Sequence, residues 1–181
     1  PCKNSFSEHI KFMLNRKNSV NGIPYKQDKT IMAWEVANEP RIWNIENEKA
    51  FTNWLNEVAS TIKSNDKNHL LTTGSEGKAG SNDDIAAFER THNNPNIDYL
   101  TMHIWPKNWG WYNINDEKNS TEVAIKKTND YIDEHIKVAQ NLKKPLVLEE
   151  FGFPREKESL DKKASVENRN DYYEFVFEKM K

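Results

Sequence analysis

The sequence predicts an α/β fold in which parallel β-strands alternate with α-helices. Four short apolar segments, near residues 31, 70, 99 and 146, alternate with segments whose apolar residues recur at helical spacing. The strand segments are almost continuously apolar, as in strands that helices cover on both faces. This order of elements predicts parallel strands with right-handed connections. Four strands fit an open sheet, or half of an eight-stranded barrel if the chain is incomplete.

The first half of the chain is expected to begin with an amphipathic helix. Apolar residues at 6, 10, 13 and 14 share one helical face. The next segment holds an Asn-Gly pair and a proline, which indicate a loop. The expected elements are a helix (6–16), a loop (18–28), a strand (30–37), a helix (46–63) and a strand (70–73).

The second half continues the alternation and adds an aromatic loop, which follows the third strand. Indole rings in a loop suit stacking on flat ligands such as sugar rings, although the loop can also pack against itself. The expected elements are a short helix or loop (83–90), a strand (98–104), the aromatic loop (105–112), a helix (121–142), a strand (145–150) and a helix (166–180).

Composition excludes several classes of protein. The 181 residues fit one domain, and a net charge of −2 argues against binding to nucleic-acid phosphates. Cys2 is the only cysteine, and the five histidines lack zinc-ligand spacing. There is no Gly-x-Ser-x-Gly elbow, no glycine-rich phosphate loop and no apolar run long enough to span a bilayer. We therefore expect no cofactor, no metal and no membrane span.

Two glutamates stand where apolar strands end. Glu39 precedes Pro40, which cannot continue a strand ladder, and Glu150 precedes Phe151-Gly152. Carboxylates at the C-terminal ends of parallel strands are typical of α/β active sites. Retaining glycoside hydrolysis requires two of them about 5 Å apart. The alternative for Glu39 is that it is an exposed residue at the start of a loop. Glu149, the neighbour of Glu150, is expected to point the opposite way and to be structural.

His103 and Trp105 lie near the end of the third strand and share one face of it. A lone strand histidine is either a satisfied core residue or part of a site, and the sequence leaves both open. Trp34 and Trp54 lie in regular elements and are expected in the core.

The strand ends resemble glycoside hydrolase family 5. Residues 31–41, which end in Asn-Glu-Pro-Arg, are similar to the fourth-strand signature of its β-mannanases. Residues 71–77, 101–106 and 148–152 resemble the fifth, sixth and seventh strands of that family. The resemblance covers about residues 30–155.

This resemblance implies a (β/α)8 TIM barrel, of which the chain covers about strands 4 to 7 with their helices. Residues 1–181 would then be part of a catalytic domain, and the remaining strands would come from missing sequence. We expect the segment to need the rest of its protein, or another copy of itself, to fold and act. The implied substrate is β-mannan or a manno-oligosaccharide, and the implied location is extracellular or periplasmic.

The resemblance also implies roles for single residues. Glu39 would be the general acid/base and Glu150 the nucleophile. Trp105 stands where the family usually has a tyrosine that donates a hydrogen bond toward the nucleophile; an indole N–H can donate but cannot accept. The expected substrate-binding residues are Asn38 at the sugar 2-hydroxyl, His103 in the same subsite, Arg41, Glu76 and Trp43 on the leaving-group side, and Trp105 and Trp109.

Other functions stay open at this stage. A β-1,4-glucanase would use the same fold and carboxylates, although Arg41 favours mannan. A non-catalytic carbohydrate-binding fragment would use the tryptophan-rich loop and would not need both glutamates. A structural protein without a sugar ligand would leave both strand-end glutamates unexplained.

Overall fold

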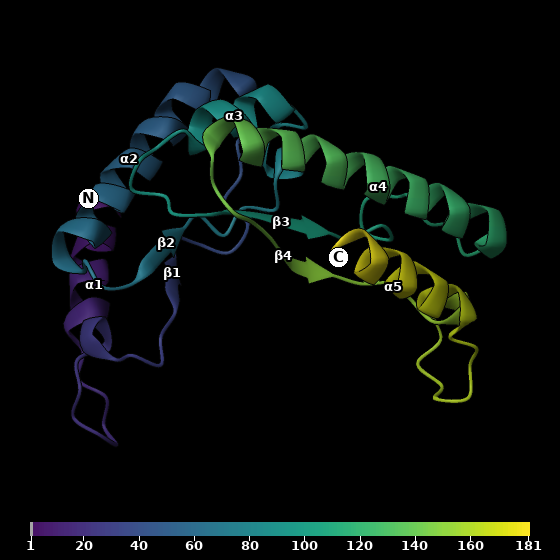
Figure 1. Cartoon of the computed structure of the whole chain (residues 1–181), viewed down its shortest axis with the longest axis horizontal. Coiled ribbons are helices and arrows are strands. Elements are labelled where there is room, and N and C mark those ends of the chain that lie inside the picture. The colour runs from purple at the N-terminus through teal and green to yellow at the C-terminus, as the bar shows by residue number, and fades with distance from the viewer. Residues whose placement is uncertain (1) are drawn as a thin grey trace. The chain divides into compact units, whose positions relative to one another are not determined.

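The computed structural model describes residues 2–181 of the chain (Figure 1). The helices of this part are α1 (Cys2–Asn15), α2 (Glu48–Asn65), α3 (Ile85–His92), α4 (Glu117–Leu142) and α5 (Glu167–Lys179). The strands are β1 (Ala33–Glu35), β2 (Leu70–Thr72), β3 (Leu100–Ile104) and β4 (Leu146–Phe151). The succession of strands and helices is the one that the sequence predicts.

The chain divides into two compact units. Unit 1 comprises Pro1–Thr101 and Val138–Val147, and unit 2 comprises Met102–Lys137 and Leu148–Lys181. The division falls inside β3, α4 and β4, so that the first residues of both strands belong to unit 1 and their last residues to unit 2.

Unit 1 contains a parallel pair of strands. β1 pairs with β2 in a register that places Ala33 opposite Leu70 and Glu35 opposite Thr72. The segment that leads into β3 lies beside β2, because the Asp98 N–H donates to Leu71 O at 2.8 Å. Parallel strands with a helical connection are the arrangement that the apolar pattern predicts.

The core of unit 1 lies where α1 and α2 pack on the buried face of this sheet. Trp34 and Trp54 pack against it partly buried, and the Trp34 indole N–H donates to Asp66 Oδ2 at 2.7 Å. The tryptophans therefore border the core that we expected them to occupy. The buried core residues are Ile10, Leu14, Val36, Leu55, Val58, Ala59, Ile62, Leu71 and Ile97.

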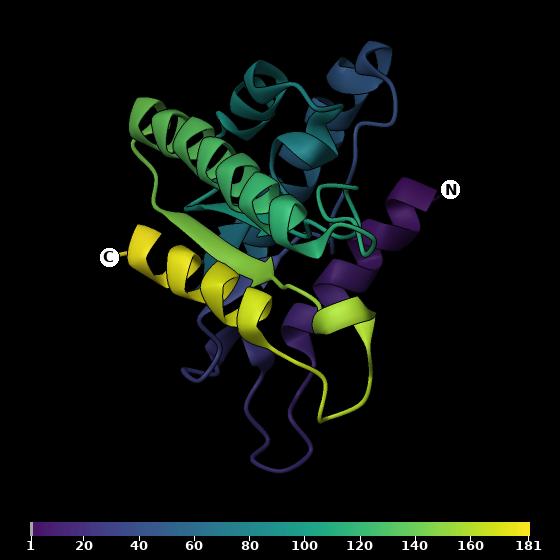
Figure 2. The same ribbon diagram turned by 90° about the vertical axis from the view of Figure 1, so that its right-hand side faces the viewer.

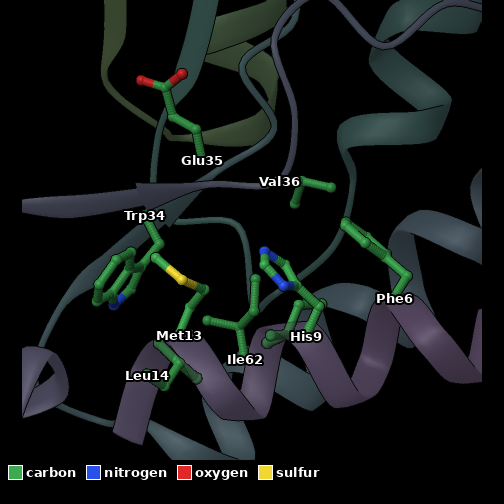
Figure 3. Close-up of a pocket in the computed structure, with 9 residues that line it drawn as sticks. Phe6, His9, Met13, Leu14, Trp34, Glu35, Val36 and Ile62 are labelled. Atoms are coloured by element: carbon green, nitrogen blue, oxygen red, sulfur yellow. The ribbon is translucent and has the colours of Figure 1, made fainter. Parts of the chain in front are cut away.

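An apolar pocket of about 260 Å³ lies between α1 and β1 in unit 1. Figure 3 shows His9 and Met13 of α1 extending from the helix toward β1, with Trp34 on the same side of the strand. Glu35 points away from these residues, to the opposite side of β1. Within residues 2–181, β1 pairs along one edge, with β2.

Unit 2 is built around the last part of β4, which runs between α4 and α5 (Figure 2). Leu148 and Phe151 of β4 pack against a cluster that includes Ala124 of α4 and Tyr172 of α5. Phe153, just after the strand, stacks on Tyr172 with ring centroids 4.7 Å apart. β3 is the neighbour of β4, and their arrows point the same way in Figure 1.

The element ends differ in detail from the prediction. α1 begins four residues earlier than expected, and β1 is shorter than the apolar run from 30 to 37. The segment predicted as a short helix or loop is helix α3, whose start is capped by Asp84, which accepts from the Ala86 N–H at 2.8 Å. None of the helices in the described part is both long and apolar enough to cross a membrane.

Candidate active site

Glu39 lies on an irregular turn that follows β1 in unit 1. Its φ is +48°, in the left-handed region that residues with a Cβ rarely adopt. The Glu39 N–H donates to Gly74 O at 2.9 Å, and the Ala37 N–H donates to Thr73 O at 3.3 Å. Pro40 follows directly and cannot extend the ladder. The loop after β2 therefore fixes the backbone on both sides of Asn38.

The guanidinium group of Arg41, on this turn, lies between the carboxylates of Glu39 and Glu76. Arg41 Nη2 donates to Glu76 Oε2 at 2.8 Å and lies 3.6 Å from Glu39 Oε2. The Glu76 side chain is 1% exposed, whereas those of Arg41 and Glu39 are 35% and 24% exposed. The pair with Glu76 is the closer one, and charge-assisted hydrogen bonds of this length are strong. The structure thus brings together three of the residues predicted for the site.

Arg41 also lies over an aromatic ring. Its guanidinium carbon is 5.6 Å from the centre of the Trp43 ring, which is within cation–π range. Trp43 is 82% exposed, so the other face of the indole is open to solvent. Asn38, at the tip of the turn, is exposed as well. Such a flat, open ring beside polar groups is suited to stacking on a sugar.

Glu150 lies inside β4 in unit 2, where an indole N–H and an imidazole nitrogen lie beside one of its oxygens. The Trp105 indole N–H donates to Glu150 Oε2 at 3.2 Å, so the hydrogen bond that the resemblance implied is present. His103 Nδ1 lies 3.5 Å from the same oxygen. The His103 side chain is 2% exposed, which places this ring at a buried position beside the carboxylate.

Glu149 lies closer to this group than strand alternation led us to expect. Its Oε2 is 3.5 Å from His103 Nε2, so the two neighbouring glutamates approach opposite nitrogens of one imidazole. A glutamate side chain is long enough to reach around the strand even when its Cβ points away. The Glu149 side chain is 17% exposed and that of Glu150 is 39% exposed. A neutral imidazole carries one N–H, so it donates to one of the two at a time.

Gly152 allows the Trp105 ring to lie against the end of β4. A Cβ at this position would be 2.5 Å from Trp105 Cζ3, closer than real contacts. The indole of Trp105 therefore occupies the space that a side chain at position 152 would need. A pocket of about 360 Å³ adjoins the ring, and its lining includes Phe151 and Tyr173.

Trp109 packs inside unit 2. Its ring centre lies 4.9 Å from that of Trp111 and 5.2 Å from that of Tyr131 on α4. Tyr131 in turn stacks on His135 at 4.2 Å. The alternative of a loop packed against itself therefore describes Trp109 and Trp111, and a substrate contact by Trp109 stays a prediction.

Sequence reasoning missed Gly74 as part of the site. The signal was the Gly-Ser-Glu-Gly run that begins at Gly74, just beyond the end of β2, within the segment 71–77 that resembles the fifth strand of the family. In the structure, Gly74 has a φ of +70° and accepts the hydrogen bond from Glu39.

A family model described as GH family 5 beta-mannosidase-like matches residues 1–181. The chain belongs to this glycoside hydrolase family. It is 33% identical to mannan endo-1,4-beta-mannosidase 5 of Arabidopsis thaliana over 97% of the chain and 42% of that relative. The chain thus spans about two-fifths of the length of the curated relatives that it matches.

Solved structures of this family agree with the fold. A glycoside hydrolase family 5 mannosidase from Rhizomucor miehei matches with a TM-score of 0.83 at 33% identity, over 97% of this chain and 41% of that one. An endo-1,4-beta-D-mannanase from Thermotoga petrophila matches with a TM-score of 0.76 at 27% identity, over 98% of this chain and 50% of that one. The chain is therefore an α/β segment of the family 5 barrel fold.

Proposed function

We propose that the full-length protein containing this chain hydrolyses β-1,4-mannosidic bonds inside mannan chains, with retention at the anomeric carbon. The observation that carries the proposal is a glutamate near or at the end of each of two strands, β1 and β4, each with a different set of polar partners. Membership of the family and the mannan endo-1,4-beta-mannosidases among the relatives support mannan as the substrate.

Glu150 is the proposed nucleophile. Its carboxylate attacks the anomeric carbon and forms a covalent glycosyl-enzyme intermediate. Oε2 is engaged by Trp105 and lies beside His103, so Oε1 is the oxygen that we assign to the attack. The indole N–H orients the carboxylate without offering a competing acceptor.

Glu39 is the proposed general acid/base. It protonates the glycosidic oxygen as the bond to the leaving sugar breaks, and then removes a proton from the water that releases the glycosyl-enzyme. This mechanism requires the two carboxyl groups to act about 5 Å apart.

The substrate contacts are proposed from the surroundings of these glutamates. Asn38, exposed beside Glu39, is assigned to the sugar 2-hydroxyl, and His103 to the same subsite. Arg41, Glu76 and the open ring of Trp43 are assigned to the leaving-group side. Trp105 and Trp109 complete the proposed set, and Trp109 also packs on Trp111 and Tyr131.

Residues 1–181 are proposed to be part of a (β/α)8 catalytic domain and to cover about strands 4 to 7. The relatives' greater length supports this. The apolar pocket beside β1, a strand that pairs along one edge within residues 2–181, also supports it, because unpaired strand edges recruit further strands. An extracellular or periplasmic location is part of the proposal and follows from a polymeric substrate.

The decisive experiment is parallel digestion of mannohexaose and cellohexaose by the full-length protein and by the 181-residue chain. We expect cleavage of mannohexaose by the full-length protein and none by the shorter chain. Faster cleavage of cellohexaose would replace the proposal with a glucanase. Binding to mannohexaose without cleavage by the full-length protein would instead indicate a carbohydrate-binding function.

A further inference from the structure

The turn that carries Glu39 rests directly on Gly74, with no space between them for a side chain. A Cβ built at Gly74 would lie 2.1 Å from the carbonyl oxygen of Ala37 and 3.2 Å from its carbonyl carbon. These are backbone atoms, so a rotamer change cannot relieve the clash. The added Cβ would also lie 3.1 Å from Glu35 Oε2, on a further side of the same space.

The backbone of Gly74 also holds the turn. Its carbonyl oxygen accepts the Glu39 N–H at 2.9 Å, and its φ of +70° is one that glycine adopts without cost. Glu39, in contrast, carries a Cβ at a φ of +48°. A conformation of this kind persists only where the surroundings enforce it.

From this contact we infer that Gly74 is a positioning residue for the general acid/base. By lacking a Cβ it allows the chain at Ala37 to approach, and by accepting from the Glu39 N–H it holds Glu39 in its left-handed conformation. Gly74 touches no substrate and acts through Glu39. The inference rests on the role proposed above for Glu39.

A misplaced acid has a recognisable kinetic signature. Protonation of the leaving oxygen matters for a sugar leaving group, whereas a dinitrophenolate departs without a proton because its conjugate acid is strong. Misplacing a catalytic group by 1 Å costs about 10²-fold in rate. A defect confined to Glu39 therefore lowers cleavage of mannohexaose and spares attack by the nucleophile on a dinitrophenyl β-mannoside.

The test is Gly74→Ala in the full-length protein. We expect kcat/KM to fall about 10²-fold on mannohexaose, with formation of the glycosyl-enzyme from 2,4-dinitrophenyl β-mannobioside little changed. Gly22→Ala is the matched control, because Gly22 has the same φ of +70° but an added Cβ would meet nothing within 4 Å. This control carries the conformational cost without the clash and is expected to keep both activities.

Gly80→Ala is a second, milder variant in case Gly74→Ala does not fold. Its Cβ would lie 3.3 Å from Pro40 O and 3.2 Å from Glu76 Cγ, so it presses on the same turn less severely. We expect the same selective loss with a smaller magnitude. Equal loss on both substrates, or no loss on either, in the variants that fold would overturn the inference.

Glu39→Ala separates this inference from the proposed function. If Glu39→Ala spares the dinitrophenyl substrate and Gly74→Ala does not reproduce that pattern, the positioning role is wrong and the function stands. If Glu39→Ala lowers both activities equally, the acid/base role of Glu39 is itself wrong.

Discussion

Glu39 lies on an irregular turn beyond β1, at a left-handed φ, whereas Glu150 lies inside β4 in extended backbone. Across the turn, the Arg41 guanidinium lies 3.6 Å from the Glu39 carboxylate. Glu150 instead meets an indole N–H at 3.2 Å and an imidazole nitrogen at 3.5 Å. Glu39 therefore lies on a left-handed turn beside a guanidinium. Glu150 lies in a strand beside an indole donor and an imidazole ring.

This difference matches the two tasks proposed for the carboxylates. A nucleophile must keep one oxygen aimed at a carbon atom, which a strand and a fixed N–H achieve. An acid/base must release and regain a proton, and its partners must tolerate both states. Glu39 shares Arg41 with the buried Glu76, so Arg41 keeps a carboxylate partner when Glu39 is neutral.

The largest effect is expected for Glu150→Gln. The amide keeps the shape of the side chain and can still accept from Trp105, but it cannot attack the anomeric carbon. We expect kcat on mannohexaose to fall by about 10⁴-fold or more, with little change in binding measured by calorimetry. Glu149→Gln is the neighbouring control and is expected to retain turnover. Turnover unchanged in Glu150→Gln would remove this residue from the mechanism.

The second largest effect is expected for Trp105→Phe, which removes the N–H that orients Glu150. A hydrogen bond to a charged group contributes about 1.5–3 kcal/mol, so the rate of glycosyl-enzyme formation should fall roughly 10- to 100-fold. Pre-steady-state measurement with a dinitrophenyl mannoside reports this step directly. Trp111→Phe is the control, since that indole packs on Tyr131. An equal loss in both variants would assign Trp105 to packing alone.

A smaller effect is expected for Glu76→Gln. The neutral amide weakens the hold on Arg41, which lies 3.6 Å from Glu39 and is then drawn toward that carboxylate. We expect kcat/KM on mannohexaose to fall by about 3- to 10-fold, equivalent to roughly 1 kcal/mol. Glu48→Gln breaks the bidentate pair with Arg90, which is more exposed, and serves as the matched control with unchanged kinetics. No difference between these variants would show that the Arg41–Glu76 pair does not influence catalysis.

The smallest effect concerns the stability of unit 1, which carries Glu39. Burial disfavours the charged ring of His69, but its contacts with Asp28 O at 3.0 Å and Asp66 Oδ2 at 2.6 Å prevail and raise its pKa. Its stabilising contribution is therefore complete below about pH 6.5 and is lost as the pH rises through the higher folded pKa. Burial by itself would raise the pKa of Asp66, but hydrogen-bond donors that include the Trp34 indole outweigh burial, so the pKa of Asp66 is lowered.

We accordingly expect the difference in Tm between the wild type and His69→Gln to be largest near pH 6 and to shrink as the pH rises toward 9. A constant difference for His69→Gln would show that the charge of this ring does not contribute. Because the Asp66 carboxylate has a lowered pKa, its own contribution is lost only at acidic pH, as the pH falls through that value.

The order of the elements was predictable because apolar periodicity is a local property of the chain. The apolar run Leu146–Leu148 is visible in the sequence and forms the first half of β4. The length of β1 was not predictable, because the apolar run from residue 30 pairs with β2 only over Ala33–Glu35. The partner strand, and not the run itself, decides where a ladder ends.

The site was predictable in its residue types and less so in its geometry. The strand-end positions of Glu39 and Glu150 pointed to chemistry, and Glu76 and Arg41 proved to be partners. The shared approach of Glu149 and Glu150 to His103 was not predictable from alternation, which describes Cβ directions and not the ends of long side chains. The role of Gly74 depends on a contact between two loops, which no local pattern encodes.

The left-handed backbone of Glu39 has a consequence for selection. Glycine would adopt a φ of +48° freely, so the protein carries a local cost of about 1–3 kcal/mol to keep a carboxylate at this position. Substitution by glycine should therefore raise the melting temperature while abolishing catalysis. A library of variants screened for heat resistance alone would be expected to enrich glycine at position 39, and one screened for sugar release would never tolerate it.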